Sequence, residues 1–231
     1  ALATAISQFA SAILCLIHLL RTKEEYRLYI SKIRFDGRVL GEIIRNGVPS
    51  GFQNSVISIA NVFVQTNINA FGKMAMAGCG SYAKIEGFAF LPVTCFTMAL
   101  TTFVSQNLGA KQYDRAKKGA RFGILCSVAI AELIGFVIYV AAPTLIAAFN
   151  SDPSVVHYGV MQARTIALFY FLLAFSHCIA AVLRGSGHAS IPMAVMLCVW
   201  CLFRVSYITV TVRLIPDIRV IFWAYPLTWS I

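Results

Sequence analysis

The sequence contains few charged residues, and acidic residues are the scarcest. Of its 231 residues, 9 are Asp or Glu and 19 are Lys or Arg, so that 12% of the chain is charged. A soluble domain of this length carries about twice that share. Hydrophobic residues instead make up 59% of the chain, and its mean hydropathy is +0.76. These values exclude an ordinary water-soluble domain and indicate a membrane protein.

Sequence signals of metal, cofactor or catalytic chemistry are also missing. Cys198 and Cys201 match a C-x-x-C pattern, but they lie inside an apolar stretch without a second pair, so we predict that the cysteines behave as small hydrophobic residues. The four histidines are scattered, and the chain has no phosphate-binding glycine loop or nucleophile–base pair. We therefore expect no metal, no cofactor and no enzymatic activity.

The apolar residues are gathered into seven runs. A transmembrane helix needs about 20 such residues, and six of the runs are long enough, whereas the seventh is expected to be an incomplete span. The fold class predicted from this pattern is an all-α, polytopic transmembrane helix bundle. The six runs are residues 1–20, 47–71, 85–106, 122–149, 158–183 and 189–212, and the seventh is 218–231.

Basic residues are distributed unequally between the gaps that separate the runs. Seven lie in residues 21–45, five in 111–121, and Arg184 follows the fifth run, whereas the alternate gaps contain only Lys73, Lys84, Arg213 and Arg219. Cytoplasmic loops are the ones enriched in Lys and Arg, so the first set of gaps is predicted to be cytoplasmic. The net charge of +10 therefore favours anionic lipid headgroups over nucleic acid as the partner.

The second run carries the clearest candidate site. Five polar side chains are spaced by 4, 3, 4 and 4 residues, which places them within an arc of about 80° on a helix. Amides that face lipid are costly, so this polar stripe is expected either to hydrogen-bond to other helices or to line a water-filled substrate pathway. We favour the pathway. The members of the polar stripe are Asn54, Ser58, Asn61, Gln65 and Asn69.

The third run adds further candidates. Its threonines are placed in the same predicted pathway, and Pro92 is expected to kink the helix. Glu86 lies near the outer end of the run, where it is either an ion-coupling carboxylate or the partner of Lys84 or Lys73. The three threonines are Thr94, Thr97 and Thr101.

Glu132 lies eleven residues into the fourth run, near the expected middle of the membrane. An unpaired carboxylate there is expensive, so we expect Glu132 either to bind a coupling ion or to form a buried ion pair. Arg204 in the sixth run and Arg164 in the fifth are the available charge partners. His177 is expected to be a hydrogen-bonded core residue rather than a proton relay.

Several stretches resemble one protein family. At 104–119 the chain reads VSQNLGAKQYDRAKKG, an apolar helix end that runs directly into a basic segment. This is similar to the second helix of a lobe in the multidrug and toxic compound extrusion (MATE) transporters. Four further stretches match in the same order: NGVPSGFQNSVISIANVFVQTNINAFG at 46–72, KIEGFAFLP at 84–92, FNSDPSVVHYG at 149–159 and VLRGSGHASIPM at 182–193.

The resemblance implies a domain organisation. MATE transporters have two six-helix lobes joined by a cytoplasmic loop. Residues 1–20 would then be the last helix of the N-terminal lobe, 21–46 the linker, and 47–231 the C-terminal lobe with its last helix truncated. No initiator Met and no basic segment precede the first run, so the chain is expected to be a fragment without a visible signal peptide.

The resemblance also implies a function. It implies export of small organic, often cationic, compounds in exchange for H⁺ or Na⁺, by alternating access of two lobes in the cell membrane of a bacterium. Several MATE subgroups place an acid in the first helix of this lobe, whereas this chain has none between Glu42 and Glu86. The alternatives are a lipid-linked saccharide flippase of the same wider superfamily and a membrane-embedded enzyme, which would need clustered His, Asp or Glu.

The basic asymmetry generates a prediction about topology. We expect residues 21–45 and 111–121 to face the cytoplasm, because loops rich in Lys and Arg stay on that side of the membrane. We expect residues 73–84 and 150–157 to face outwards. Single cysteines placed in a cysteine-free variant and labelled with a membrane-impermeant maleimide would measure this. If the cysteine of Arg115→Cys were labelled from outside the cell, the predicted orientation would be wrong.

Overall fold

A computed structural model describes residues 2–24, 26–30 and 34–231. These residues form helices joined by short connections, and no strand occurs among them, which confirms the all-α fold class. The elements are α1 (Leu2–Arg21), α2 (Gly37–Asn69), α3 (Lys73–Gly109), α4 (Tyr113–Ala147), α5 (Pro153–Ile166), η2 (Ala167–Phe169), α6 (Tyr170–Gly185), α7 (Ser190–Met196), η3 (Leu197–Phe203), α8 (Arg204–Leu214) and α9 (Ile218–Ser230).

The chain divides into two compact units, Ala1–Ile43 and Ile44–Ile231. The first unit contains α1, none of whose residues is buried, and the first turns of α2. The predicted linker 21–46 therefore ends inside a helix, because α2 begins at Gly37. The predicted domain limits remain an interpretation.

Among the described residues, five helical stretches are long and apolar enough to cross a membrane. They are Leu2–Arg21, Lys73–Gly109, Tyr113–Ala147, Pro153–Gly185 and Ser190–Leu214. Helix α2 has 33 residues but is not among these stretches, because its polar side chains lower its hydropathy, so the expectation that the second run spans the membrane stays a prediction. Helix α9 is too short, at 13 residues. The helices also extend beyond the apolar runs: α3 begins at Lys73 rather than Ile85.

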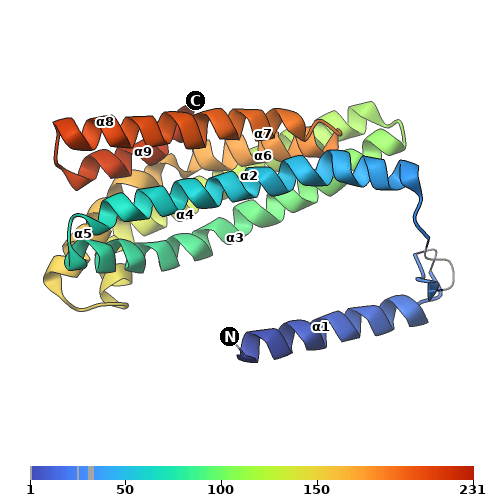
Figure 1. Cartoon of the computed structure of the whole chain (residues 1–231), viewed down its shortest axis with the longest axis horizontal. Coiled ribbons are helices and arrows are strands. Elements are labelled where there is room, and N and C mark those ends of the chain that lie inside the picture. Colours follow the sequence, from blue (N-terminus) through green and yellow to red (C-terminus); the bar gives the residue numbers. More distant parts are fainter. Residues whose placement is uncertain (1, 25, 31–33) are drawn as a thin grey trace. The chain divides into compact units, whose positions relative to one another are not determined.

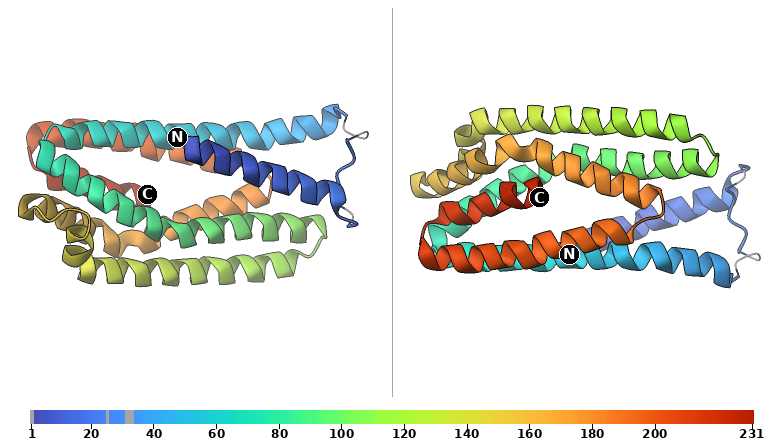
Figure 2. Two further views of the ribbon diagram at one scale, coloured as in Figure 1. Left: turned by 90° about the horizontal axis from the view of Figure 1, so that it is seen from below. Right: turned by 90° about the horizontal axis from the view of Figure 1, so that it is seen from above.

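The second unit is built in two layers (Figures 1 and 2). Helices α3, α4 and α6 form one layer, α2 and α8 run side by side in the other, and α9 lies between the layers. The layers meet where α2 ends and α3 begins. There Val64 and Ile68 of α2 pack with Ala75 of α3, Ile208 of α8 and Phe222 of α9.

Helix α3 approaches α5 and α6 closely because its contacts are made by glycine. A Cβ atom at Gly78 would lie 2.5 Å from the carbonyl oxygen of Val155, and one at Gly185 would lie 2.6 Å from that of Thr101. Small residues allow such backbone contacts between membrane helices. The close contacts fix α3 against both neighbours and make this layer rigid.

Two helical stretches change geometry along their length. Between α5 and α6 the chain forms one 3₁₀ turn, η2, and between α7 and α8 it forms the π-helical segment η3. Both interruptions release backbone groups from the regular α-helical pattern, and π segments often occur at functional sites. Pro92 and Pro143 lie inside α3 and α4.

The glycine contacts generate a prediction about stability. Gly78→Ala should destabilise the full-length protein by about 1–3 kcal/mol, because the new methyl group meets the backbone of α5. Thermal unfolding in detergent measures the effect. The matched control is Gly87→Ala on the same helix, where a Cβ meets nothing within 4 Å and no loss is expected. Equal stability of both variants would contradict the close contact.

Candidate functional site

The polar stripe of α2 lies on the surface of the second unit. All five of its members are exposed, whereas Val56, Ala60, Val64 and Ile68 on another face of the same helix are buried. The two faces are centred roughly 120° apart at 100° per residue. The helix therefore packs with its apolar face and leaves the polar stripe uncovered by the rest of this unit.

The side chains of the polar stripe find few partners within the unit. Gln65 donates from Nε2 to Oδ1 of Asn69 at 2.8 Å, and the hydroxyl of Ser58 donates to the carbonyl oxygen of Asn54. Both bonds connect residues four positions apart on α2. The structure thus shows no hydrogen bond from the polar stripe to another described helix, and interhelical packing within this unit does not explain it.

The predicted pathway threonines are bonded to their own helix. Thr94 donates to Phe90 O, Thr97 to Thr94 O, and Thr101 to Thr97 O. Thr101 also donates to Ala181 O of α6 at 3.2 Å, which makes it part of the packing between α3 and α6. Among the described residues no hydrogen bond joins these threonines to the polar stripe.

Glu132 forms no ion pair with an arginine among the described residues, so that of its two alternatives the buried ion pair is not found and the coupling role stays a prediction. Its carboxylate accepts a hydrogen bond from the backbone N–H of Phe171, the second residue of α6. The first N–H groups of a helix have no intrahelical acceptor, and here they are released by the 3₁₀ turn η2. Glu132 therefore caps α6 inside the membrane, while its Oε2 is buried without a partner.

Arg164 and Lys84 also have partners other than those expected. The guanidinium of Arg164 lies 5.7 Å from the ring centre of Tyr139, and Lys84 Nζ lies 5.2 Å from that of Phe149. Neither cation forms an ion pair in the described part of the chain. They are held by aromatic faces, which attract cations through the ring quadrupole.

The other arginine is fully buried at the start of α8. Arg204 has 0% exposure, and its guanidinium carbon lies 4.2 Å from the ring centre of Trp200 and 4.7 Å from that of Tyr225. Its Nη2 donates to the hydroxyl of Thr228, but Nε and Nη1 have no partner. A buried cation with two free donors is costly unless a nearby group compensates it.

Glu86 supplies the compensating charge. Because α3 begins at Lys73, Glu86 lies about 20 Å along the helix axis from its start, far deeper than the sequence suggested. It is half-buried and interacts electrostatically with Arg204, although no direct ion pair closes the gap. Of the two alternatives for Glu86, an ion pair with Lys84 or Lys73 is not found among the described residues, and the ion-coupling role stays a prediction.

Three tyrosines complete the surroundings of Glu86. Tyr82 and Tyr170 are buried and share a hydrogen bond of 2.8 Å between their hydroxyl groups, and both interact electrostatically with Glu86, as does Tyr225. We call the whole set the Arg204 cluster. It joins α3, α6, η3, α8 and α9, and its members are Tyr82, Glu86, Tyr170, Trp200, Arg204, Tyr225 and Thr228.

Sequence reasoning missed most of the Arg204 cluster. One signal was available, since Tyr82 precedes Glu86 by four residues and Trp200 precedes Arg204 by four, which puts each pair on one helix face. Nothing comparable pointed to Tyr170, Tyr225 or Thr228, which come from other helices.

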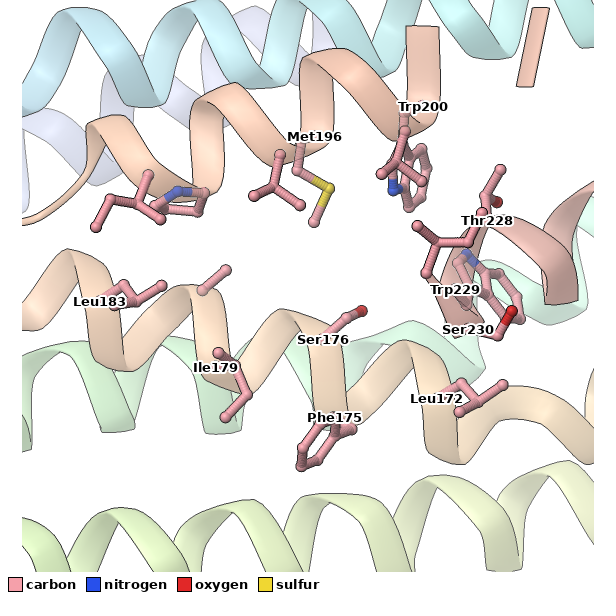
Figure 3. A pocket seen from close by; sticks show the side chains of 16 residues that line it. Leu172, Phe175, Ser176, Ile179, Leu183, Met196, Trp200, Thr228, Trp229 and Ser230 are labelled. Carbon is pink, nitrogen blue, oxygen red and sulfur yellow. The ribbon is translucent and has the colours of Figure 1, made fainter. Parts of the chain in front are cut away.

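A cavity of about 330 Å³ lies beside the Arg204 cluster. Figure 3 shows Leu172, Ile179 and Leu183 of α6 along one wall and Met196 opposite, with Thr228 and Trp229 at one end. Thr228 is the residue that accepts the Arg204 hydrogen bond. Apart from Thr228, Ser176 and Ser230 the lining of the cavity is mostly apolar, and the cavity is separate from the polar stripe. His177 is half-buried nearby and packs edge-on against Phe90 and Trp200.

The long apolar helices, with an exposed polar stripe and a buried charge cluster between them, are those of a multi-pass membrane protein. The MatE family model matches residues 49–209, which is more than half of the chain. The chain therefore belongs to the MatE family of membrane transporters.

Relatives and solved structures agree with this assignment. The chain is 27% identical over 195 residues to the probable multidrug resistance protein NorM of Thermotoga maritima, covering 84% of this chain and 42% of that protein. It is 24% identical over 200 residues to the probable multidrug resistance protein YoeA of Bacillus subtilis, covering 84% and 43%. The chain thus spans about two fifths of the length of these curated relatives.

The fold matches a solved MATE structure. The crystal structure of MATE in complex with MaL6 superposes with a TM-score of 0.89 at 18% identity, covering 98% of this chain and 52% of that chain. At this level of identity the likeness establishes the fold alone. The recognition of the family from sequence is confirmed.

The role found for Glu132 generates a prediction. Glu132→Leu removes the acceptor for Phe171 N–H and should cost about 1–3 kcal/mol of stability. Glu132→Gln keeps an oxygen acceptor and should cost less. Adding Arg204→Gln to Glu132→Gln should bring no recovery, because the two residues are not a pair. Thermal unfolding in detergent measures all three variants, and recovery in the double variant would restore the ion-pair interpretation.

Proposed function

We propose that this chain is the C-terminal part of a secondary active transporter. It exports small organic, often cationic, compounds across the bacterial cell membrane in exchange for H⁺ or Na⁺ and works by alternating access. Its lobe operates together with an N-terminal lobe of the same protein. The relatives named as multidrug resistance proteins support the substrate class.

The observation that carries the proposal is the exposed polar stripe. Four turns of α2 present Asn54, Ser58, Asn61, Gln65 and Asn69 outside the packed core of the lobe. Against lipid, each unsatisfied polar group would cost several kcal/mol. The polar stripe is stable in a membrane only if it faces water or polar groups of a second lobe. A central cleft between two lobes meets this requirement and gives a polar substrate its route.

Uncharged amides suit such a route. Amide oxygens accept hydrogen bonds from ammonium groups, and amide N–H groups donate to polar substrates, so one surface can accommodate different compounds without a fixed charge. Weak, repeated contacts also allow a substrate to leave again. The driving ion would then act elsewhere, and Glu86 and Glu132 are the carboxylates placed inside the lobe.

The structure does not favour the flippase alternative. A pyrophosphate headgroup requires accessible cations in a groove, whereas Arg204 is fully buried and Arg164 lies over Tyr139. Neither arginine is on the face that carries the polar stripe. Export of organic cations therefore fits the described surface better.

The polar stripe generates a prediction for the full-length transporter. Asn61→Leu and Gln65→Leu should each reduce ethidium efflux from cells several-fold while membrane abundance stays near normal, because they remove polar contacts in the pathway without touching the packed face. Efflux and abundance are measured in the same cells.

Thr66→Leu is the matched control. Thr66 is exposed, adjacent to Gln65 in sequence but about 100° around the helix, and its hydroxyl is already bonded to Val62 O at 2.9 Å. It should transport normally. If both variants of the polar stripe matched this control, the pathway would not run along α2.

A further inference from the structure

A second hollow, of about 500 Å³, is lined by residues of α4, α5, η2 and α9. Three basic side chains line it, those of His157 and Arg164 on α5 and of Arg219 on α9, and we call it the basic hollow. His157 and Arg219 belong to the gaps that are poor in Lys and Arg. On the side of the lobe with few cations, basic residues of two different helices therefore share one hollow.

Helix periodicity explains how these side chains meet. On α5, His157, Met161 and Arg164 stand at positions i, i+4 and i+7, which places them on one helix face over about 10 Å. On α9, Arg219 and Trp223 stand at positions i and i+4 and share a face in the same way. Helices α5 and α9 pack against each other, and this packing brings the two faces to one hollow.

The basic side chains of the hollow have no acidic partner in the described part of the chain. Arg164 lies over the ring of Tyr139, and His157 packs edge-on against a neighbouring ring. Arg219 bonds only through its backbone N–H, which donates to Oδ1 of Asp217 at 2.9 Å. Asp217 thereby caps α9 and does not line the hollow. Two exposed guanidinium groups are thus left without a compensating charge.

Most of the other lining residues are aromatic or apolar. Tyr139 and Trp223 combine an apolar ring with a polar group, and such residues gather at the level of the lipid headgroups. Phe169 packs edge-on against Trp223, with 5.7 Å between the ring centres. Together with Val160 and Met161, Phe169 adds apolar surface to the hollow. The hollow therefore offers positive charge and apolar surface side by side.

From this geometry we infer that the basic hollow binds an anionic phospholipid, with Arg164 and Arg219 on its phosphate group and its acyl chains against the apolar side chains. A guanidinium binds phosphate through paired hydrogen bonds, and His157 offers a further N–H donor. A zwitterionic headgroup would bring its own cation beside two arginines, so a headgroup with net negative charge is favoured. Inorganic phosphate could use the arginines but not the apolar surface.

The lipid site is separate from the proposed transport route and does not rest on it. No described residue of α2, the helix that carries the polar stripe, lines the hollow. The lipid is thus a bound component of the lobe and not its cargo. Because one arginine comes from α5 and the other from α9, the lipid bridges two helices. On the predicted topology the hollow lies at the outer boundary of the membrane and takes its lipid from the outer leaflet.

Thermal unfolding of the full-length protein in detergent tests the site. The protein is titrated with dioctanoyl phosphatidylglycerol, with dioctanoyl phosphatidylcholine or with inorganic phosphate. A ligand that binds only the folded state raises the melting temperature, so we expect phosphatidylglycerol to raise that of wild type by several degrees and to saturate. The other two ligands should have little effect. Arg164→Gln combined with Arg219→Gln should lose most of the phosphatidylglycerol shift.

Lys117→Gln combined with Arg213→Gln is the matched control. Both residues are exposed, neither lines the hollow, and the variant loses the same two charges. It should keep the phosphatidylglycerol shift. Each variant is compared with itself without lipid, so that loss of the contact between Arg164 and Tyr139 does not count as loss of binding. Arg219→Gln alone should also reduce the shift, and it decides if the double variant does not fold.

Four outcomes would overturn the inference. Equal shifts with both lipids would show a groove that does not recognise charge, and an equal shift with inorganic phosphate would show a site for free anions. Equal loss in the control variant would reduce the effect to net charge. An undiminished shift in Arg219→Gln and in the double variant would place the lipid elsewhere. The proposed function is not affected by any of them, because ethidium efflux is measured separately.

Discussion

In the hydrocarbon core of a membrane there is no water to satisfy a polar group, so each such group must find a partner within the protein. The described chain meets this constraint mostly within single helices. Hydroxyl groups such as those of Thr94 and Thr209 donate to a carbonyl four residues earlier. Where a helix is interrupted, a side chain replaces the missing partner, as Glu132 does at Phe171.

Several described groups leave this constraint unmet, and the polar stripe and Arg204 are the two most prominent. The polar stripe of α2 has partners only along its own helix and faces away from the core. Arg204 has two buried donors without an acceptor and depends on Trp200, Tyr225 and Glu86 for compensation. Polar groups inside a membrane are expensive, and where they occur they mark pathways and ion sites.

The geometry around these features combines rigid and irregular parts. Gly78 and Gly185 bring α3 into backbone contact with α5 and α6. The π-helical segment η3 ends directly before Arg204, and the 3₁₀ turn η2 precedes Tyr170. The Arg204 cluster is thus assembled next to the two irregular segments, where backbone geometry adjusts at low cost.

Much of this protein could be predicted from its sequence. Apolar runs fixed the helices, because the thickness of a bilayer sets the length of a span, and the spacing of Asn54, Ser58, Asn61, Gln65 and Asn69 placed them on one face, because the period of a helix is local. Helix ends were less predictable, as the start of α3 at Lys73 shows, since helices continue through the polar headgroup region where hydropathy no longer marks them.

Only the tertiary structure decided which charges meet. From sequence, Arg204 and Arg164 were the available partners of Glu132, and Glu86 was placed near the outer end of its run. Packing instead places Arg204 within the electrostatic reach of Glu86 and turns Glu132 towards the start of α6. Which charges meet depends on the orientations of α3, α6, α8 and α9 about their axes. Those orientations are set by contacts between residues far apart in the sequence; Glu86 and Arg204, for example, are more than a hundred positions apart. No local sequence pattern encodes such contacts.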